Sequence, residues 1–169
     1  MNQIEIYKHE VDYINKLPIS DNAKKVLFTL LVKHKFGFHN LLNTKEMRDS
    51  VCTDYKRLWK EKFDEYMSEL FKYKTDPKPS LLKPIDYDEK GFITFDKRMI
   101  EGASEIIITV TNHMKAGLYL DYYNHVPLVK LCDICNEPFK AGSGAAKHCD
   151  NCKATILADQ KKKWDQQNR

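Results

Sequence analysis

Four of the chain's five cysteines stand in two C-x-x-C pairs. The first pair is Cys132 and Cys135, and the second pair, Cys149 and Cys152, follows after thirteen residues. The two thiolates of each pair can converge on one metal ion from a tight turn, and the separation of the pairs is typical of a structural zinc site. Four thiolates complete a tetrahedron around zinc and leave no position for water or substrate. The sequence therefore predicts a closed zinc site that stabilises structure and performs no chemistry.

The segment that carries these cysteines is too short to fold by apolar burial alone. Structural zinc contributes on the order of 10–16 kcal/mol at neutral pH, which supplies the missing stability. Two disulfides are the alternative use of the four cysteines, and they require an oxidising compartment. The start of the sequence has no basic stretch before an apolar run and so gives no sign of a secretion signal. We therefore expect four zinc-bound thiolates in a cytoplasmic protein.

The rest of the chain shows no catalytic grouping. Its histidines are scattered, and no acid–base pair, activated nucleophile or phosphate-binding glycine loop is present. The fifth cysteine, Cys52, is interpreted as a small buried apolar side chain. The longest apolar runs, residues 27–32 and 106–110, are far too short to span a bilayer. We therefore expect neither an enzyme nor a membrane protein.

The charge of the chain is only mildly basic, with a formal net charge of +4. Of its 28 basic residues only four are arginines, at positions 48, 57, 98 and 169. Lysine is a point charge suited to phosphate oxygens, whereas bidentate reading of guanine is mainly a task of arginine. This composition favours contact with the phosphate backbone over base reading if the partner is nucleic acid, and a bias of an AT-rich genome explains it equally well.

Periodicity and turn residues predict a chain of helices and short strands. A helix over residues 20–35 has Ser20 as its N-cap and apolar residues at i, i+3, i+4, i+7 and i+8. The remaining expected elements are a short helix over 43–50, a long helix over 54–73, a hairpin formed by 81–87 and 92–95, a buried strand over 105–111, a helix over 115–123 and a terminal helix over 153–167.

The order of helix, short helix, turn, long helix and hairpin over residues 18–97 resembles the winged helix-turn-helix fold. The resemblance implies that the start of the long helix enters the major groove of DNA, while the hairpin is the wing beside the phosphate backbone. The residues implied in DNA contact are Thr53, Tyr55, Lys56, Arg57 and Lys60 on the helix, and Lys83 and Lys90 on the wing. Residues 44–75 nevertheless hold eight basic and seven acidic side chains, so an ordinary solvated helix face remains the alternative.

Residues 131–139 and 147–153, which flank the cysteines, resemble a small treble-clef or zinc-ribbon module. Modules of this kind recur in short proteins of bacteriophages, plasmids and their Gram-positive hosts. The resemblance implies that Ile134 and Phe139 supply the few apolar contacts of the module, and that residues 142–144 form the turn of its hairpin. Lysines at positions 140, 147 and 153 are placed to offset the formal charge of −2 on a zinc ion bound by four thiolates.

Together these observations predict an α+β fold with three parts: a winged-helix-like domain over 1–98, a strand and helix connector over 99–130, and a zinc module with a terminal helix over 131–169. The function that this architecture favours is a small DNA-binding regulatory protein, encoded by a phage or mobile element, that binds double-stranded DNA. The alternative is a protein-binding inhibitor or adaptor of a host or phage enzyme, in which aromatic side chains anchor the interface.

Overall fold

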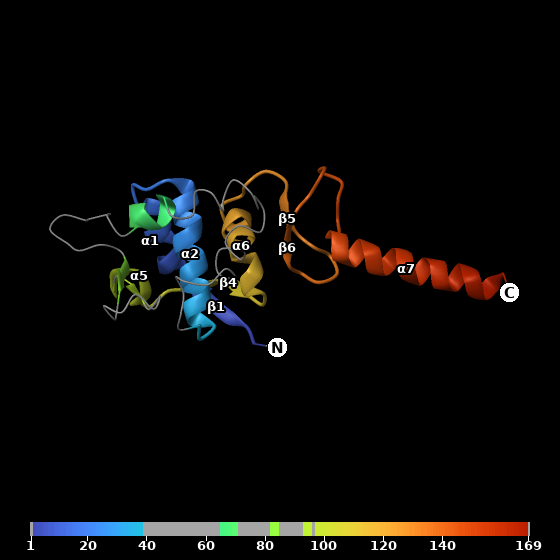
Figure 1. Cartoon of the computed structure of the whole chain (residues 1–169), viewed down its shortest axis with the longest axis horizontal. Coiled ribbons are helices and arrows are strands. Elements are labelled where there is room, and N and C mark those ends of the chain that lie inside the picture. Colours follow the sequence, from blue (N-terminus) through green and yellow to red (C-terminus); the bar gives the residue numbers. More distant parts are fainter. Residues whose placement is uncertain (1, 39–64, 71–81, 85–92, 96, 169) are drawn as a thin grey trace. The chain divides into compact units, whose positions relative to one another are not determined.

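The computed structural model describes residues 2–38, 65–70, 82–84, 93–95 and 97–168, and these form two compact units. The first unit spans Met1–Leu120 and the second spans Asp121–Arg169 (Figure 1). The described residues have a mixed α+β structure, with a four-cysteine cluster in the second unit. No helix in the described ranges is both long and apolar enough to cross a membrane.

A two-stranded antiparallel sheet joins the start of the first unit to its end. Strand β1 (Ile4–Tyr7) pairs with β4 (Ile106–Val110), with Ile6 opposite Ile108 and a bulge after Ile6. The strand predicted at 105–111 is confirmed, but it is only partly buried: Ile108 and Val110 are buried, whereas Ile106 is 49% exposed. A two-stranded sheet that packs on helices through one face leaves the other face in solvent.

Helix α2 (Asp21–Lys35) forms the centre of the first unit, and its predicted bounds and N-cap are confirmed. The Ser20 hydroxyl accepts a hydrogen bond from the backbone N–H of Ala23, 3.2 Å away, which satisfies one of the free donors of the first turn. Most of the helix is buried, and four of its side chains are among the largest fully buried ones of the described chain: Leu27, Phe28, Leu30 and Leu31.

Helix α1 (Lys8–Lys16) precedes α2 and contributes a buried ion pair to the first unit. The Glu10 carboxylate accepts from the Tyr7 backbone N–H at 2.9 Å and from the Lys35 ammonium at 2.6 Å. Glu10 therefore links the end of β1, the first turn of α1 and the last turn of α2. The Glu10 side chain is 1% exposed, and its burial is tolerated because the carboxylate has both a hydrogen-bond donor and a charged partner.

The long helix predicted at 54–73 is described only over residues 65–70, which are helical. Its side chains Tyr66, Met67 and Leu70 are buried. Two hydrogen bonds of 2.8 Å run from the backbone N–H and hydroxyl of Ser20 to the Glu69 carboxylate and hold this helix against the start of α2. The short helix predicted at 43–50 lies outside the described residues.

The predicted hairpin is confirmed by the antiparallel pairing of β2 (Leu82–Pro84) with β3 (Ile93–Phe95). Phe95 is buried, and its ring lies 5.2 Å from the His34 ring in the last turn of α2, measured between centroids. The first unit is completed by α5 (Lys97–Ile100), by a 3₁₀ turn (His113–Lys115) and by the start of α6 (Ala116–Tyr123), which confirms the helix predicted at 115–123.

The second unit consists of a short hairpin followed by one long helix. Strand β5 (Val129–Leu131) pairs antiparallel with β6 (Pro138–Lys140), and helix α7 runs over Asp150–Gln167. The terminal helix is confirmed, but it begins three residues before the predicted start at 153. One cysteine pair lies in the turn of the hairpin, and the other lies at the start of the helix.

Candidate metal centre

The first cysteine pair lies in the turn that connects β5 to β6. The backbone N–H of Cys132 donates to the Glu137 carbonyl at 3.0 Å, and the N–H of Asn136 donates back to the Cys132 carbonyl at 2.9 Å. Asn136 closes the turn with a φ of 55°, a left-handed conformation that asparagine adopts more readily than most residues. This folding brings both thiols of the pair to one side of the hairpin tip.

The second pair lies at the beginning of α7. Cys149 is the N-cap residue, with extended backbone angles, and Cys152 falls in the first helical turn. A backbone hydrogen bond of 3.0 Å from Asp133 to the Lys147 carbonyl holds the segment before Cys149 against the hairpin turn. A helix start presents free N–H groups and a positive dipole end, both of which favour thiolates.

The four sulfur atoms meet in one cluster. All lie within 4.8 Å of one another, and Sγ of Cys135 is 3.8 Å from Sγ of Cys149. Thiolates about 2.3 Å from a tetrahedral zinc ion lie about 3.8 Å apart, whereas a disulfide requires about 2.05 Å. All four cysteines are free. The donor set and its spacing therefore fit a four-thiolate zinc ion and do not fit two disulfides.

Hydrogen bonds to the sulfur of Cys132 lower the pKa of its thiol. Burial raises the pKa of the Cys132 thiol, but backbone N–H groups that donate toward its sulfur outweigh burial and lower the pKa to about 6. The main donors are the N–H groups of Cys135, Cys149 and Ile134. The lowered pKa favours the thiolate form of Cys132, which is the form that binds zinc.

The pKa of two other sulfurs in the cluster is shifted in the opposite direction. Hydrogen bonding to the Cys149 sulfur, together with burial and the charge of Cys132, raises the pKa of Cys152 to about 12. Burial raises the pKa of Cys135 as well. Crowded thiols resist a second and third negative charge, and a divalent cation among them removes that resistance. Both the electrostatics and the geometry of the cluster thus favour the binding of a divalent metal ion.

A small apolar core supports the cluster. Cys132, Phe139, Ala141 and Cys149 are buried together, with Ala146 and Cys152 packed against them. The predicted contact of Phe139 is confirmed, since its side chain is 8% exposed. The predicted contact of Ile134 is wrong, because this side chain is 56% exposed. Ile134 stands at the tip of the turn between two ligands whose own side chains occupy the inner face.

The turn of the hairpin was predicted at residues 142–144, and this placement is wrong, although the chain does turn there: the Ala146 backbone N–H donates to the Ser143 carbonyl at 3.2 Å. The hairpin turns through residues 132–137, between β5 and β6, and residues 142–144 belong to the loop between β6 and the second cysteine pair. The C-x-x-C segment makes the turn itself and needs no glycine, because Asn136 supplies the left-handed conformation. An asparagine directly after the first pair was the sequence signal for this turn.

The structure brings together the four predicted zinc ligands, but it does not test the predicted DNA contacts. Lys83 lies on β2 of the hairpin, as the winged-helix resemblance implies. The other predicted DNA-contacting residues lie outside the described residues: Thr53, Tyr55, Lys56, Arg57, Lys60 and Lys90.

Comparison of the chain with protein-family models, with curated proteins and with solved structures found no match in any of the three.

Proposed function

We propose that this chain is a small DNA-binding regulatory protein whose C-terminal module is held together by a structural zinc ion. The proposal of zinc rests on four sulfur atoms within 4.8 Å of one another. Four thiolates fill the coordination sphere, so the ion would stabilise the module and would not bind substrate. This role suits a unit whose buried cluster holds only four residues.

The positions of the ligands favour a treble-clef arrangement over a zinc ribbon. One pair comes from the turn between β5 and β6, and the other comes from the start of α7. A ribbon takes both pairs from hairpin turns, whereas a treble clef takes its second pair from the first turn of a helix. The backbone hydrogen bond from Cys149 to the Cys132 sulfur joins the two halves of this arrangement.

The observation that carries the DNA-binding proposal is the anchoring of the β2–β3 hairpin beside α2. The ring contact between Phe95 and His34 fixes the hairpin to the end of α2, and the hydrogen bonds from Ser20 to Glu69 fix residues 65–70 to its start. A winged helix places its first helix, its recognition helix and its wing in this order along the chain. Lys83 on β2 would then lie beside the phosphate backbone of DNA.

Replacement of Lys56 and Lys60 by alanine tests this proposal. We expect the double variant to bind duplex DNA more weakly, and the slope of log affinity against log salt to fall by about 1.8 if both lysines contact phosphates. The matched control replaces Lys162 and Lys163 of α7, which removes the same charge from an exposed helix. Equal affinities of the Lys56/Lys60 variant and the wild type, or no DNA binding by the wild type, would contradict the proposal.

A protein-binding inhibitor or adaptor is the second candidate, and charge balance over residues 44–75 favours it. Eight basic and seven acidic side chains in this segment make a weak electrostatic match to DNA. Purification from the native cell, scored for both nucleic acid and protein, separates the two candidates. A co-purifying protein that remains after nuclease digestion supports the adaptor, and nucleic acid alone supports the DNA-binding protein.

A further inference from the structure

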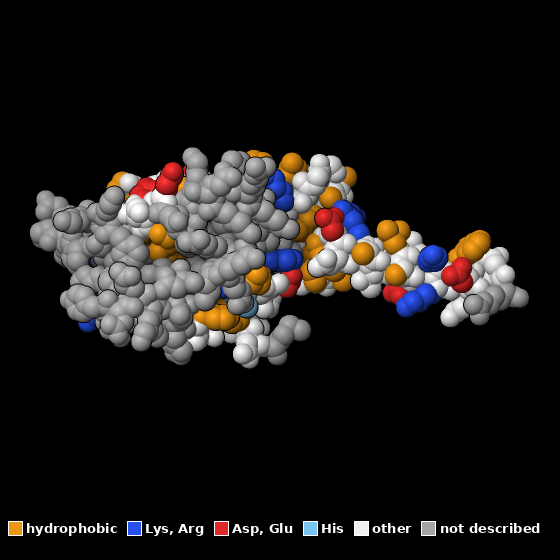
Figure 2. Space-filling model, viewed as in Figure 1, with side chains coloured by type: hydrophobic (Ala, Val, Ile, Leu, Met, Phe, Trp, Pro, Cys, Tyr) orange, Lys and Arg blue, Asp and Glu red, His pale blue; other side chains and the backbone are white. Residues whose placement is uncertain are grey.

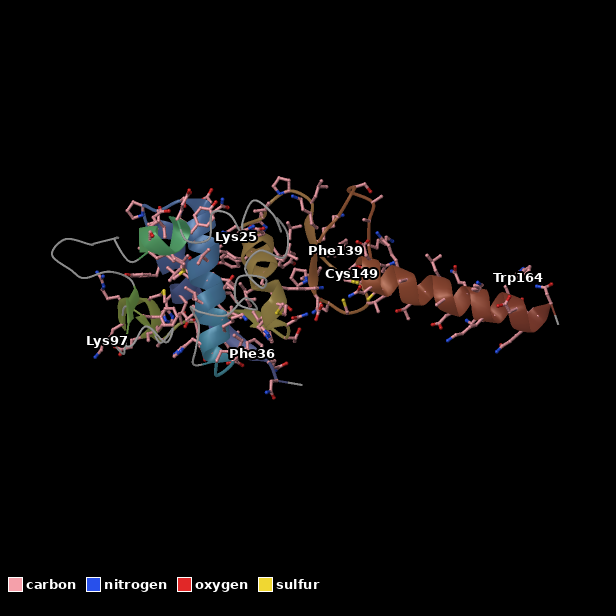
Figure 3. The ribbon with its side chains drawn as sticks, in the orientation of Figure 1. Lys25, Phe36, Lys97, Phe139, Cys149 and Trp164 are labelled. Atoms are coloured by element: carbon pink, nitrogen blue, oxygen red, sulfur yellow. The ribbon has the colours of Figure 1, made fainter. Side chains whose placement is uncertain are left out.

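Helix α7 exposes large apolar side chains that the zinc module does not use. None of the side chains of this 18-residue helix is buried. Leu157 is 64% exposed and Trp164 is 65% exposed, the two highest values among the large apolar side chains of the described residues. Figure 3 shows Trp164 far along the helix from Cys149, and Figure 2 shows apolar side chains along α7 between charged ones.

The exposed apolar side chains belong to a seam with coiled-coil spacing. Ala154, Leu157, Lys161 and Trp164 follow one another at intervals of three, four and three residues, and all four are exposed. At about 100° per residue, these positions fall within an arc of about 80° on one face of the helix. The interval pattern is that of the a and d positions of a heptad repeat. Lysine fits such a seam because its aliphatic stem covers apolar surface while its ammonium group reaches water.

The side chains of α7 pack little against the rest of the described chain. Most helix stability in proteins comes from packing of an apolar face rather than from intrinsic propensity. Beyond the cysteine at its first turn, α7 contributes only one half-buried side chain, Ile156, to the structure. The seam that contains Leu157 and Trp164 is the face that remains for packing.

We propose that α7 pairs through this seam with α7 of a second copy of the chain, as an antiparallel two-helix coiled coil. In the antiparallel register, Trp164 of each copy faces Ala154 of the other, and Leu157 faces the stem of Lys161. Each layer thus joins a large side chain to a small or flexible one, which is the condition for close packing. A parallel pair would instead oppose Lys161 to Lys161 and Trp164 to Trp164.

The residues beside the seam allow this pairing without repulsion. The antiparallel register places Lys153 opposite Gln167, Asn151 opposite Asp165, and Ala158 and Gln160 opposite their own copies. No two like charges meet, and Lys162 and Lys163 point away from the partner helix. A contact in which each side supplies the same surface closes as a two-fold dimer. Lys161 in the seam lowers the stability of the dimer, so the dimer is weak and reversible.

Sedimentation equilibrium of the zinc-loaded full chain, without DNA, tests the proposal. We expect a monomer–dimer equilibrium over a concentration range from about 1 μM to about 1 mM. Replacement of both Leu157 and Trp164 by glutamate should abolish the dimer, while Lys163→Glu, outside the seam, should leave it intact. Lys161→Leu should tighten it by about tenfold or more, because an apolar residue replaces the lysine in the seam. Equal zinc content in all variants shows that the module is still folded.

Three results would overturn the proposal: a wild-type chain that is monomeric at every concentration, a dimer that survives the double glutamate variant, or a dimer that Lys161→Leu does not strengthen. A photo-crosslinking side chain at position 154 tests the orientation, with one copy isotopically labelled. A crosslink to the neighbourhood of Trp164 in the second copy supports the antiparallel pair. A crosslink to the neighbourhood of position 154 in the second copy rejects it.

Discussion

The backbone N–H of Cys149 donates a hydrogen bond to Sγ of Cys132 over 3.4 Å, although the two residues are 17 positions apart. The donor is the N-cap residue of α7, and the acceptor is the most deeply buried sulfur of the cluster. One hydrogen bond thus connects the helix start to the hairpin turn and favours the thiolate of Cys132. The two halves of the module are therefore coupled both through this bond and through any ion that the four sulfurs share.

Replacement of Cys149 by serine should unfold the second unit. The variant loses one of four ligands and leaves a hydroxyl in a buried cluster, so we expect zinc affinity to fall by more than about 100-fold. Metal analysis should give one zinc per wild-type chain and little in the variant. Hydrogen exchange should show loss of protection over residues 129–167 and little change in α2, which belongs to the other compact unit.

Cys52→Ser is the matched control, because Cys52 lies outside the two cysteine pairs. It should keep one zinc per chain and wild-type exchange in the second unit. Chelation of the wild-type chain should reproduce the Cys149→Ser pattern. A second unit that keeps its exchange protection without metal would show that zinc does not hold it together.

Phe139 and Ile134 form a second matched pair, since both are apolar residues of the hairpin and only Phe139 is buried. Phe139→Ala removes the largest side chain of the small core around Cys132 and Cys149. We expect a loss of about 3 kcal/mol, which appears as weaker zinc binding because folding and binding are coupled. Ile134→Ala should change zinc affinity little, because that side chain is 56% exposed. Competition with a zinc-binding dye measures the zinc affinity of both variants. Equal losses of affinity would contradict the described packing.

The zinc cluster and helix α2 could be predicted because their signals are local. Ligand spacing identifies the cluster, and α2 combines a clear apolar period with Ser20 as its cap. Strand β1 was not predicted, because four residues are too short a pattern and their partner, β4, lies about a hundred positions away. Helix α1 was missed although it has local signals, since Val11 and Ile14 lie on one buried face and Glu10 is the third residue of a capping box. Its N-cap is Tyr7, which is not among the residue types that usually cap a helix.

The errors within the zinc module have a local cause. Glycines at 142 and 144 suggested the turn of the hairpin. The chain does turn from Ser143 to Ala146, but the turn between β5 and β6 forms at the cysteines, with Asn136 in a left-handed conformation. In this turn Ile134 is exposed to solvent, because the sulfurs of Cys132 and Cys135 face the cluster. Sequence spacing therefore identifies the ligands of a metal site more securely than the path of the chain between them.

Glu10→Ala should destabilise the first unit strongly. It leaves the Lys35 ammonium group and the Tyr7 N–H without the carboxylate that they share, and Lys35 is only 20% exposed. Removal of one partner from a largely buried ion pair costs about 3 kcal/mol. Urea denaturation measures the loss. Asp12→Ala is the control, because the Lys8–Asp12 pair is solvent-exposed and should contribute little.

A double-mutant cycle between Ser20 and Glu69 tests how residues 65–70 are held against α2. Ser20→Ala removes both the helix cap of α2 and the hydroxyl that donates to Glu69, and should cost about 1–2 kcal/mol in the free energy of unfolding. Glu69→Gln weakens two hydrogen bonds that end on its carboxylate but leaves the cap intact. Because both variants affect the same hydroxyl–carboxylate bond, their losses should not add: we expect a coupling energy of about 0.5–1 kcal/mol in urea denaturation. Strictly additive losses would mean that this bond does not anchor the helix, and would remove one of the two contacts that support the proposed winged-helix arrangement.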